Sequence, residues 1–355
     1  MRKILVLLIG FVIYFNCLSC KRELHDDTFS FDKVYYYAIQ EDVKKIVESI
    51  NSFNEDSLTN DQKELKRKYN SRFLFRSEKF NFNTTDTVLI KILTVFQNYW
   101  TETLMKETSL RRADEKYKIL LSNLLISINY SSNRGINQEI NRFDFEKALR
   151  NLLKEKGCFA RIDRTGNIMD LIIWIGQRVK TYDVNIEDTL LKVPVVLIDS
   201  VLSFGWEGFA TFNNFYPGGW TSPDTLFCIT KDYDLNSEKF LVSYLTHETQ
   251  HLFDSKKYRG GNPTWMEEYR AKLAELSVAD STVHNLLSGF IKGFKKDSKL
   301  PHPYAEYMVI KGLSKDLFKT DFVTDLNEWK KVPNTEINVA SRRLLKENSR
   351  TLKLK

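Results

Sequence analysis

Apolar residues recur at helical spacing through the first half of the chain. Ile39, Val43, Ile46, Val47 and Ile50 return every three or four positions, which places them on one face of an α-helix. Stretches of the same character follow at residues 87–100, 119–128 and 145–153. The pattern therefore predicts a helical region over residues 32–157.

The pattern changes after residue 157. Residues 159–162 lead into a polar turn, and runs rich in β-branched residues at 193–198 and 225–230 are typical of short strands. Residues 168–175 are apolar throughout and fit either a strand or a helix. Glycine and aromatic residues dominate 205–220, which we expect to form a loop. The predicted fold class is α+β and predominantly helical, with a small mixed sheet in the second half.

The pattern of residues 236–253 predicts a buried helix that contains candidate functional residues. The segment is apolar on most sides, and it contains the sequence His-Glu-Thr-Gln-His at residues 247–251. Side chains at i and i+4 lie one above the other on a helix, so His247 and His251 can reach one metal ion. Glu248 lies beside that position and can accept a proton from a water that the metal activates. A merely amphipathic helix is the alternative, but buried imidazoles need partners, and a metal ion is the most natural one.

Two histidines leave a metal ion short of protein ligands, because catalytic zinc usually takes three together with a water molecule. One branch of sites with this motif has a glycine and a third histidine shortly after the second one. Here Asp254 and Lys257 occupy those positions, so that branch is excluded. The remaining source is a carboxylate from a second helix. Glu268 is our candidate, and Glu267 and Glu275 are the alternatives.

The helix that carries this carboxylate is predicted to begin at Thr264. Thr264 and Glu267 have the spacing of a capping box, which would account for Glu267 as a helix-initiating residue. Glu268 then lies on the same stripe as Ala271 and Glu275. The small side chain of Ala271 allows close approach to the histidine helix, and Glu275 can orient a ligand histidine through a hydrogen bond.

This stretch resembles the gluzincin zinc metallopeptidases, a broad group of thermolysin-like and aminopeptidase-like enzymes. The matching residues are His247, Glu248, His251 and Glu268, flanked by Trp265 and Ala271. The resemblance implies that residues 158–355 form a zincin-like domain with an active-site helix. It also implies that Zn²⁺ is bound by the two histidines and Glu268, and that Glu248 is the catalytic base in the hydrolysis of a peptide or protein substrate. The chain lacks a Gly-x-Met-Glu-Asn run upstream, so recognition of a free N-terminus is not implied.

Such a reaction also needs a hydrogen-bond donor for the oxyanion, usually a tyrosine or histidine from a downstream segment. Residues 300–307 are the best local candidate, because prolines mark a helix start there. Tyr304 is our first choice for the donor, followed by His302 and Tyr307, and plain packing at a helix start is the alternative for each. An extended substrate would pair along an edge of the sheet, and we place residues 225–230 next to or at that edge.

The composition of the chain limits which classes of binding partner are expected. Lys and Arg number 53 against 46 Asp and Glu, a formal net charge of +7, and both signs are interspersed without a basic stripe. An ordinary solvated surface has this character, which argues against nucleic-acid binding. Cys158 and Cys228 are isolated from each other and from the histidine motif, so we expect them to be buried or paired rather than metal ligands.

The N-terminus resembles the signal peptide of a bacterial lipoprotein. Two basic residues precede an apolar run, residues 4–15, that is too short for a mature transmembrane helix. The run ends at Cys17-Leu18-Ser19-Cys20, which is similar to a lipobox. The resemblance implies that residues 1–20 are the signal segment, that Cys20 is lipidated, and that residues 21–31 tether an extracytoplasmic protein to a bacterial membrane. An ordinary cleaved signal peptide is the alternative.

These features predict zinc-dependent hydrolysis of peptide bonds by a lipid-anchored, extracytoplasmic metallopeptidase. The alternative is a non-enzymatic lipoprotein, either a degenerate peptidase or an assembly or binding factor, that retains the zincin fold. An amidase acting on cell-wall peptides would use the same chemistry on a different substrate.

Overall fold

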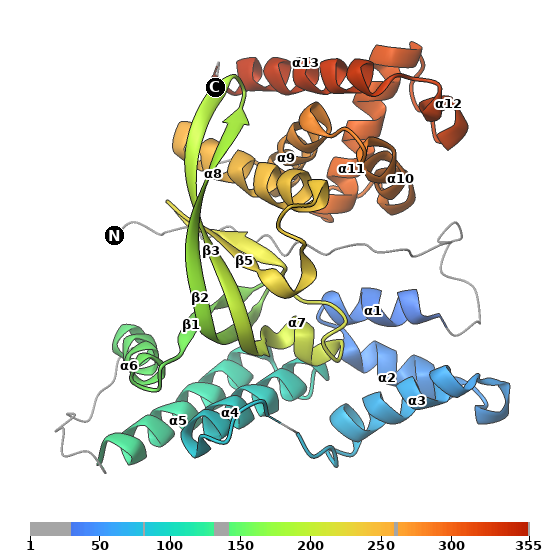
Figure 1. Cartoon of the computed structure of the whole chain (residues 1–355). Coiled ribbons are helices and arrows are strands. Elements are labelled where there is room, and N and C mark those ends of the chain that lie inside the picture. Colours follow the sequence, from blue (N-terminus) through green and yellow to red (C-terminus); the bar gives the residue numbers. More distant parts are fainter. Residues whose placement is uncertain (1–29, 81, 131–141, 259–261, 354–355) are drawn as a thin grey trace. The chain divides into compact units, whose positions relative to one another are not determined.

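The structure is a computed structural model that describes residues 30–80, 82–130, 142–258 and 262–353. It has an α+β, predominantly helical fold with one mixed sheet, which confirms the predicted fold class (Figure 1). The predicted signal segment with Cys20, and nearly all of the predicted tether, lie outside the described residues. None of the helices in the described ranges has the length and apolar character needed to cross a membrane.

Contacts between residues divide the chain into two compact units. We call residues 22–177 and 199–217 the helical unit, and residues 178–198 and 218–355 the C-terminal unit. These contacts group the first strands with the N-terminal helices. The predicted domain boundary at residues 157/158 stays a prediction. Two long strands belong in part to each unit.

The helices of the helical unit follow the apolar periodicity of the sequence. The first predicted helix is divided in two, because Glu41 adopts a left-handed conformation (φ 58°) and the side chain of Asp42 caps the second part. The principal helices are α1 (Phe31–Ile39), α2 (Val43–Ser52), α3 (Asn60–Tyr69), α4 (Thr87–Leu104), α5 (Leu110–Tyr130) and α6 (Arg142–Glu155).

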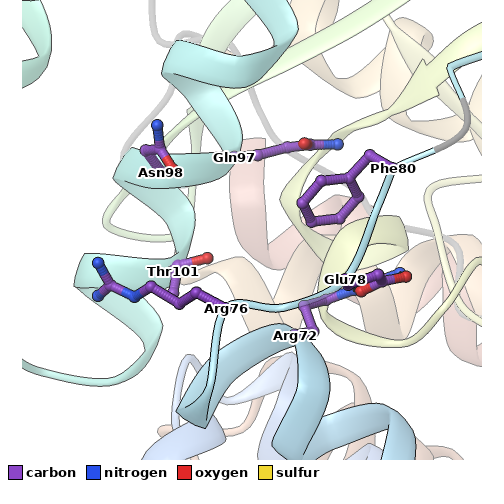
Figure 2. Close-up of a pocket in the computed structure, with 7 residues that line it drawn as sticks. All are labelled: Arg72, Arg76, Glu78, Phe80, Gln97, Asn98 and Thr101. Carbon is purple, nitrogen blue, oxygen red and sulfur yellow. Dashed lines mark hydrogen bonds and ion pairs between the residues drawn. The ribbon is translucent and has the colours of Figure 1, made fainter.

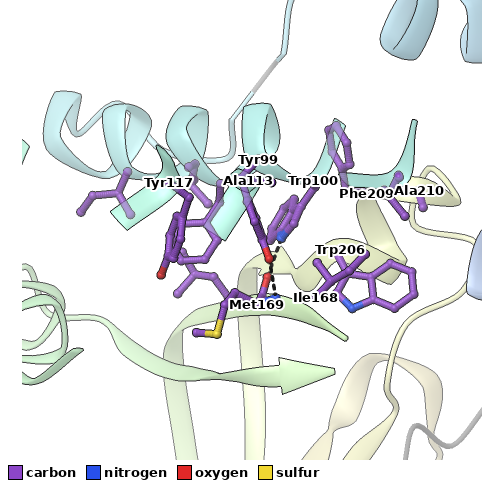
Figure 3. Close-up of a cluster of buried hydrophobic side chains, with 14 of the residues drawn as sticks. Tyr99, Trp100, Ala113, Tyr117, Ile168, Met169, Trp206, Phe209 and Ala210 are labelled. Atoms are coloured by element: carbon purple, nitrogen blue, oxygen red, sulfur yellow. Dashed lines mark hydrogen bonds between the residues drawn. The ribbon is translucent and has the colours of Figure 1, made fainter. Parts of the chain in front are cut away.

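Aromatic side chains of α4 join this unit's core to the sheet, as Figure 3 shows. The indole of Trp100 donates to the carbonyl of Met169 at 2.9 Å, and the amide of Met169 donates to the hydroxyl of Tyr99 at 3.1 Å. Both bonds are buried, so they satisfy polar groups that could not reach water and fix α4 against the start of a strand.

Residues 205–210 correct one prediction. They form a short helix, α7 (Gly205–Ala210), where we expected a loop. Gly205 has φ +79°, and a Cβ atom there would collide with the Asp170 carboxylate, so glycine lets the chain turn tightly over that acid. Asp170 then accepts a hydrogen bond from the backbone N–H of Trp206, the next residue of α7, at 2.8 Å. The buried ring of Trp206 holds the helix in the core.

The sheet has the strand order β1-β2-β3-β5-β4. β1 is antiparallel to β2, β5 is parallel to β3 with Val195 opposite Leu226, and β4 is antiparallel to β5 with Thr221 opposite Leu226. The ambiguous residues 168–175 are strand. The strand predicted at 225–230 is β5, which lies next to the edge strand β4. The bounds are β1 Phe159–Thr165, β2 Ile168–Ile186, β3 Thr189–Phe204, β4 Gly219–Thr221 and β5 Leu226–Ile229.

The C-terminal unit has two apolar clusters. One lies between strands and the histidine helix and includes Phe240, Tyr244 and Leu252. The other, which includes Leu273 and Leu287, joins the later helices. The helices of this unit are α8 (His247–Lys257), α9 (Thr264–Val278), α10 (Val283–Gly293), α11 (Pro301–Leu313), α12 (Leu326–Lys330) and α13 (Asn334–Lys353).

Candidate metal centre

The histidine motif opens α8. The preceding residues, Lys239–Thr246, continue the same helix with wider, π-helical turns, so that the Thr246 hydroxyl donates to the carbonyl of Leu241, five residues back. Residues 247–252 are all buried, as the apolar surroundings of the motif predict. The motif therefore lies inside the protein on a helix whose neighbours fix its orientation.

His247, His251 and Glu268 converge in one buried group. Each offers a ligand atom, and these atoms lie within 4.8 Å of one another. The two imidazole Nε2 atoms are 3.1 Å apart, and the Glu268 carboxylate oxygens lie 3.5 Å from Nε2 of His247 and 3.6 Å from Nε2 of His251. The side chains are at most 4% exposed, which excludes a chance cluster on a solvated surface. This group can hold a metal ion.

The protonation of His251 and Glu268 fits a metal ligand set. For His247, burial is outweighed by hydrogen bonds to Glu268 and Glu275, which raise its pKa to about 10, so a metal ion would have to displace the proton of this ring. Burial lowers the pKa of His251 to about 3, so its imidazole is neutral and carries the lone pair that a metal requires. His302 and His247 outweigh burial and hold the pKa of Glu268 well below its usual range, which keeps this carboxylate ionised. Glu248 Oε1 is buried with no hydrogen-bond partner among the described residues, so the cluster contains a polar atom that the protein alone does not satisfy.

Glu275 orients His247. Its Oε1 lies 2.6 Å from Nδ1 of His247, and the side chain is 3% exposed. A carboxylate at Nδ1 fixes the tautomer that leaves Nε2 for the metal and raises the basicity of the ring. The predicted contact between Glu275 and one of the two histidines is thereby confirmed, and the role of His247 as a metal ligand stays a prediction.

The start of α9 corrects another prediction. The residue before the helix is Pro263, and no side chain caps the helix, so the capping box expected from Thr264 and Glu267 is absent from this described segment. Burial and the neighbouring carboxylates of Glu268 and Asp254 instead raise the pKa of Glu267 to about 7. The carboxylate in the ligand group is Glu268, and not its neighbour Glu267.

Glu248 is held by the edge strand of the sheet. The hydroxyl of Thr221, on β4, donates to Glu248 Oε2 at 2.6 Å. A side chain at Gly219 would collide with the ring of Tyr244, so this glycine lets β4 lie directly against the histidine helix. Burial raises the pKa of Glu248 to about 7, within the range that suits a general base at neutral pH. Nothing in the sequence pattern singles out Thr221.

The start of α11 brings His302 to the cluster. Nδ1 of His302 lies 2.9 Å from Glu268 Oε2, and one turn further along both helices Lys272 Nζ lies 3.1 Å from Glu306 Oε1. Tyr304, our first choice as oxyanion donor, packs its ring edge-on against Trp265 at a centroid distance of 5.1 Å. Of the two, His302 is the one that contacts a ligand residue, and Tyr304 stays a prediction.

Across the part of the chain that the structure describes, no other group of potential ligand side chains converges in this way. The pocket in Figure 2 belongs to the helical unit, and its two arginines are paired within the protein, Arg72 with Glu78 and Arg76 with Glu107. Cys158 and Cys228 are both buried, which agrees with one of the two alternatives expected for them. The pocket is lined by Arg72, Arg76, Glu78, Phe80, Gln97, Asn98 and Thr101.

Comparison of the chain with protein-family models, with curated proteins and with solved structures finds no match.

Proposed function

We propose that the protein is a zinc-dependent peptidase whose metal ion is held by His247, His251 and Glu268. The observation that carries the proposal is the buried convergence of two imidazole nitrogens and a carboxylate. A further buried carboxylate, Glu248, interacts electrostatically with His247 and Glu268. Two histidines and one glutamate are a ligand set of catalytic zinc, which leaves one position open for water. Zinc, when bound, supplies Lewis acidity that favours ionisation of a water molecule and polarises a substrate carbonyl.

Glu248 is the proposed proton carrier. Its carboxylate would accept a proton from the attacking water and later deliver it to the leaving amine. The bond from Thr221 fixes one carboxylate oxygen at 2.6 Å, and the other oxygen has no partner among the described side chains and backbone groups, so it is available to a water molecule. A buried position supports this role, because an unsolvated carboxylate is a stronger proton acceptor than a solvated one.

The developing oxyanion needs a donor from the protein. Tyr304 is our first proposal, on the resemblance to gluzincins, and His302 is the second. The support for His302 is its contact with Glu268, which holds the imidazole beside the ligand group.

An extended peptide is the proposed substrate form. β4 is the last strand of the sheet order and carries Thr221, whose hydroxyl contacts Glu248. An edge strand offers unpaired backbone groups to an added strand, so a peptide paired with Gly219–Thr221 would run beside the proposed base.

We also propose that the protein is lipid-anchored through Cys20 and acts outside the cytoplasm of a bacterium. The support is the sequence of residues 1–20, with its basic start, apolar run and terminal Cys-Leu-Ser-Cys. Incorporation of a labelled fatty acid into the wild-type chain, and its loss in Cys20→Ala, would test the anchor independently of activity.

Metal content and peptide cleavage test the activity together. We expect about one zinc ion per chain, with cleavage of a peptide library that stops on addition of a chelator and returns with zinc. The matched pair Glu268→Gln and Glu267→Gln separates ligand from neighbour, since only the first should lose zinc after dialysis. The pair His251→Ala and His284→Ala does the same for the histidines.

Two outcomes would contradict the proposal. A wild-type chain that stays free of metal in excess zinc would exclude the metal centre. Full zinc occupancy without cleavage of any peptide would favour the alternative of a binding protein that retains the fold.

A further inference from the structure

One guanidinium joins the two helices that carry the metal ligands. Arg270 lies on α9 two residues after Glu268, and its side chain is completely buried. Its Nε donates to Asp254 Oδ2 at 2.7 Å and its Nη2 donates to Asp254 Oδ1 at 2.9 Å. Asp254 lies on α8 three residues after His251. This bidentate pair therefore spans from the helix of the histidines to the helix of Glu268, within one turn of a ligand on each.

The same guanidinium is fixed from a third and a fourth segment. Its Nη2 also donates to Glu187, in the turn between β2 and β3, and its Nη1 donates to the hydroxyl of Ser349 on α13 at 2.9 Å. Ser349 in turn donates to Glu187 Oε1 at 2.7 Å. On the α8 side, the amide of Gln250 donates to Asp254 Oδ1 at 2.8 Å. All three nitrogens of Arg270 are thus engaged, and the guanidinium cannot turn without breaking several buried hydrogen bonds.

The charges of this group balance. Arg270 and Lys257 face Asp254 and Glu187, with Lys257 Nζ 2.9 Å from Glu187 Oε2. Because positive and negative groups are equal in number, the network adds no net charge near the ligand group. Its effect on a metal ion comes from geometry, through the spacing of α8 and α9, and not from its field. A rigid planar fork is required for that, and lysine cannot replace it.

We propose that Arg270 is a positioning residue for the metal centre, which holds His251 and Glu268 at ligand distance by clamping α8 to α9 through Asp254. The inference rests on the proposed zinc site. Supporting residues of this kind, which touch no metal, typically change metal affinity about 10–100-fold when they are replaced.

Arg270→Lys is the main test, because it keeps the charge and loses the fork. We expect its dissociation constant for zinc, measured by competition with a chromophoric chelator, to rise about 10–100-fold. The visible absorption of the Co²⁺-loaded protein, which reports ligand geometry, should broaden or shift. Arg270→Met, which also removes the positive charge between Asp254 and Glu187, should weaken zinc binding further.

Leu287→Ala is the matched control for lost stability. Leu287 is fully buried in the cluster of the later helices, and its truncation destabilises the fold without touching the clamp. We expect it to lower the unfolding temperature at least as much as Arg270→Lys while leaving zinc affinity and the Co²⁺ spectrum unchanged.

The outcomes distinguish this inference from the proposed function. A wild-type chain that binds neither Zn²⁺ nor Co²⁺ refutes the metal centre, and the clamp with it. A wild type that binds zinc, together with an Arg270→Lys variant of equal affinity and an unchanged Co²⁺ spectrum, overturns the clamp alone.

Discussion

Both units of this protein bury acidic side chains, but the hydrogen bonding of these carboxylates differs between the units. In the helical unit, Asp170 is 2% exposed and both of its oxygens are hydrogen-bonded. Oδ1 accepts from the backbone N–H groups of Leu171 and Trp206, and Oδ2 accepts from the Thr165 hydroxyl at 2.8 Å. In the C-terminal unit, Glu248 is 0% exposed, and one of its two oxygens has no hydrogen-bond partner within the described ranges.

The difference separates a structural acid from the acid that we propose to be reactive. A buried carboxylate whose two oxygens both accept hydrogen bonds from the protein stabilises the local backbone. Glu248, by contrast, interacts electrostatically with His247 and Glu268, two members of the group in which imidazole nitrogens and a carboxylate converge. Burial of a carboxylate alone therefore does not identify a functional site. Such a site is indicated when polar atoms without hydrogen-bond partners converge.

The largest effect expected from this comparison follows from Glu248→Gln. The amide cannot accept the proton from water, so peptide hydrolysis should fall about 10²–10⁴-fold while zinc content is retained. Elemental mass spectrometry and a cleavage assay on the same sample measure both. Glu207→Gln, which changes a buried acid of the helical unit, is the control and should leave hydrolysis per folded molecule unchanged. Wild-type rates in Glu248→Gln would remove that residue from catalysis.

Glu275→Gln tests an acid that acts through another residue. Its carboxylate, 2.6 Å from His247 Nδ1, should make the ring a better ligand, and the neutral amide should raise the dissociation constant for zinc about tenfold. Isothermal titration with zinc in a competing chelator would measure the change. Unaltered affinity would assign Glu275 to packing alone.

Local periodicity accounts for what the sequence predicts correctly. His247 and His251 share a helix face because of the helical repeat, and Glu275 reaches His247 because it lies on the same stripe of α9 as Glu268. The helices of the first half follow in the same way from apolar spacing. These predictions need only the geometry of one element and one pairing of two helices.

Contacts between distant segments account for what the sequence does not predict. Thr221 precedes Glu248 by 27 positions, and their hydrogen bond depends on the register of an edge strand that no local pattern specifies. Arg270 and Asp254, 16 positions apart, look like ordinary surface charges of amphipathic helices until the packing of α8 on α9 buries them. No signal in the sequence singles out Arg270, because Glu267, Glu268 and Lys272 surround it with other charges.

The helix at residues 205–210 shows the same limit of prediction from local sequence. Glycine and aromatic residues there are typical of a loop. Tertiary packing outweighs that preference, because Asp170 binds the N–H of Trp206 and the core takes up its ring. The missing capping box at Thr264 has a comparable cause, since Glu267 is partly buried beside two other acids.

The pH dependence of folding stability should differ between the two units. Glu207, in the helical unit, should give the larger effect. Burial, with the nearby Asp170 carboxylate, raises the pKa of Glu207 from 4.5 to about 8. A raised acid pKa means that the stabilisation is complete below about pH 4.5 and is lost as pH rises through about 8. Glu207→Gln has no charge to bury, so relative to wild type it should gain more than about 1 kcal/mol between pH 5 and pH 9. Urea denaturation at both pH values would show this. A difference that does not change with pH would mean that Glu207 titrates normally.

Glu238 should behave in the opposite sense, with a smaller effect. Its two carboxylate oxygens accept from the backbone N–H groups of Asp280, Ser281 and Thr282 and from two hydroxyls, which closes the turn before α10. Although burial acts against it, these hydrogen bonds lower the pKa of Glu238 from 4.5 to about 2.

A lowered acid pKa gives stabilisation that is present above about pH 4.5 and disappears as pH falls through about 2. Glu238→Gln should therefore be less stable than wild type at pH 7 by about 1 kcal/mol, a modest value because the side chain is partly exposed. The gap should narrow in urea denaturation as pH falls from about 4.5 to about 2.5 and close below about pH 2. If it stays constant, the carboxylate contributes through shape and not through charge, and the contrast with Glu207 would rest on burial alone.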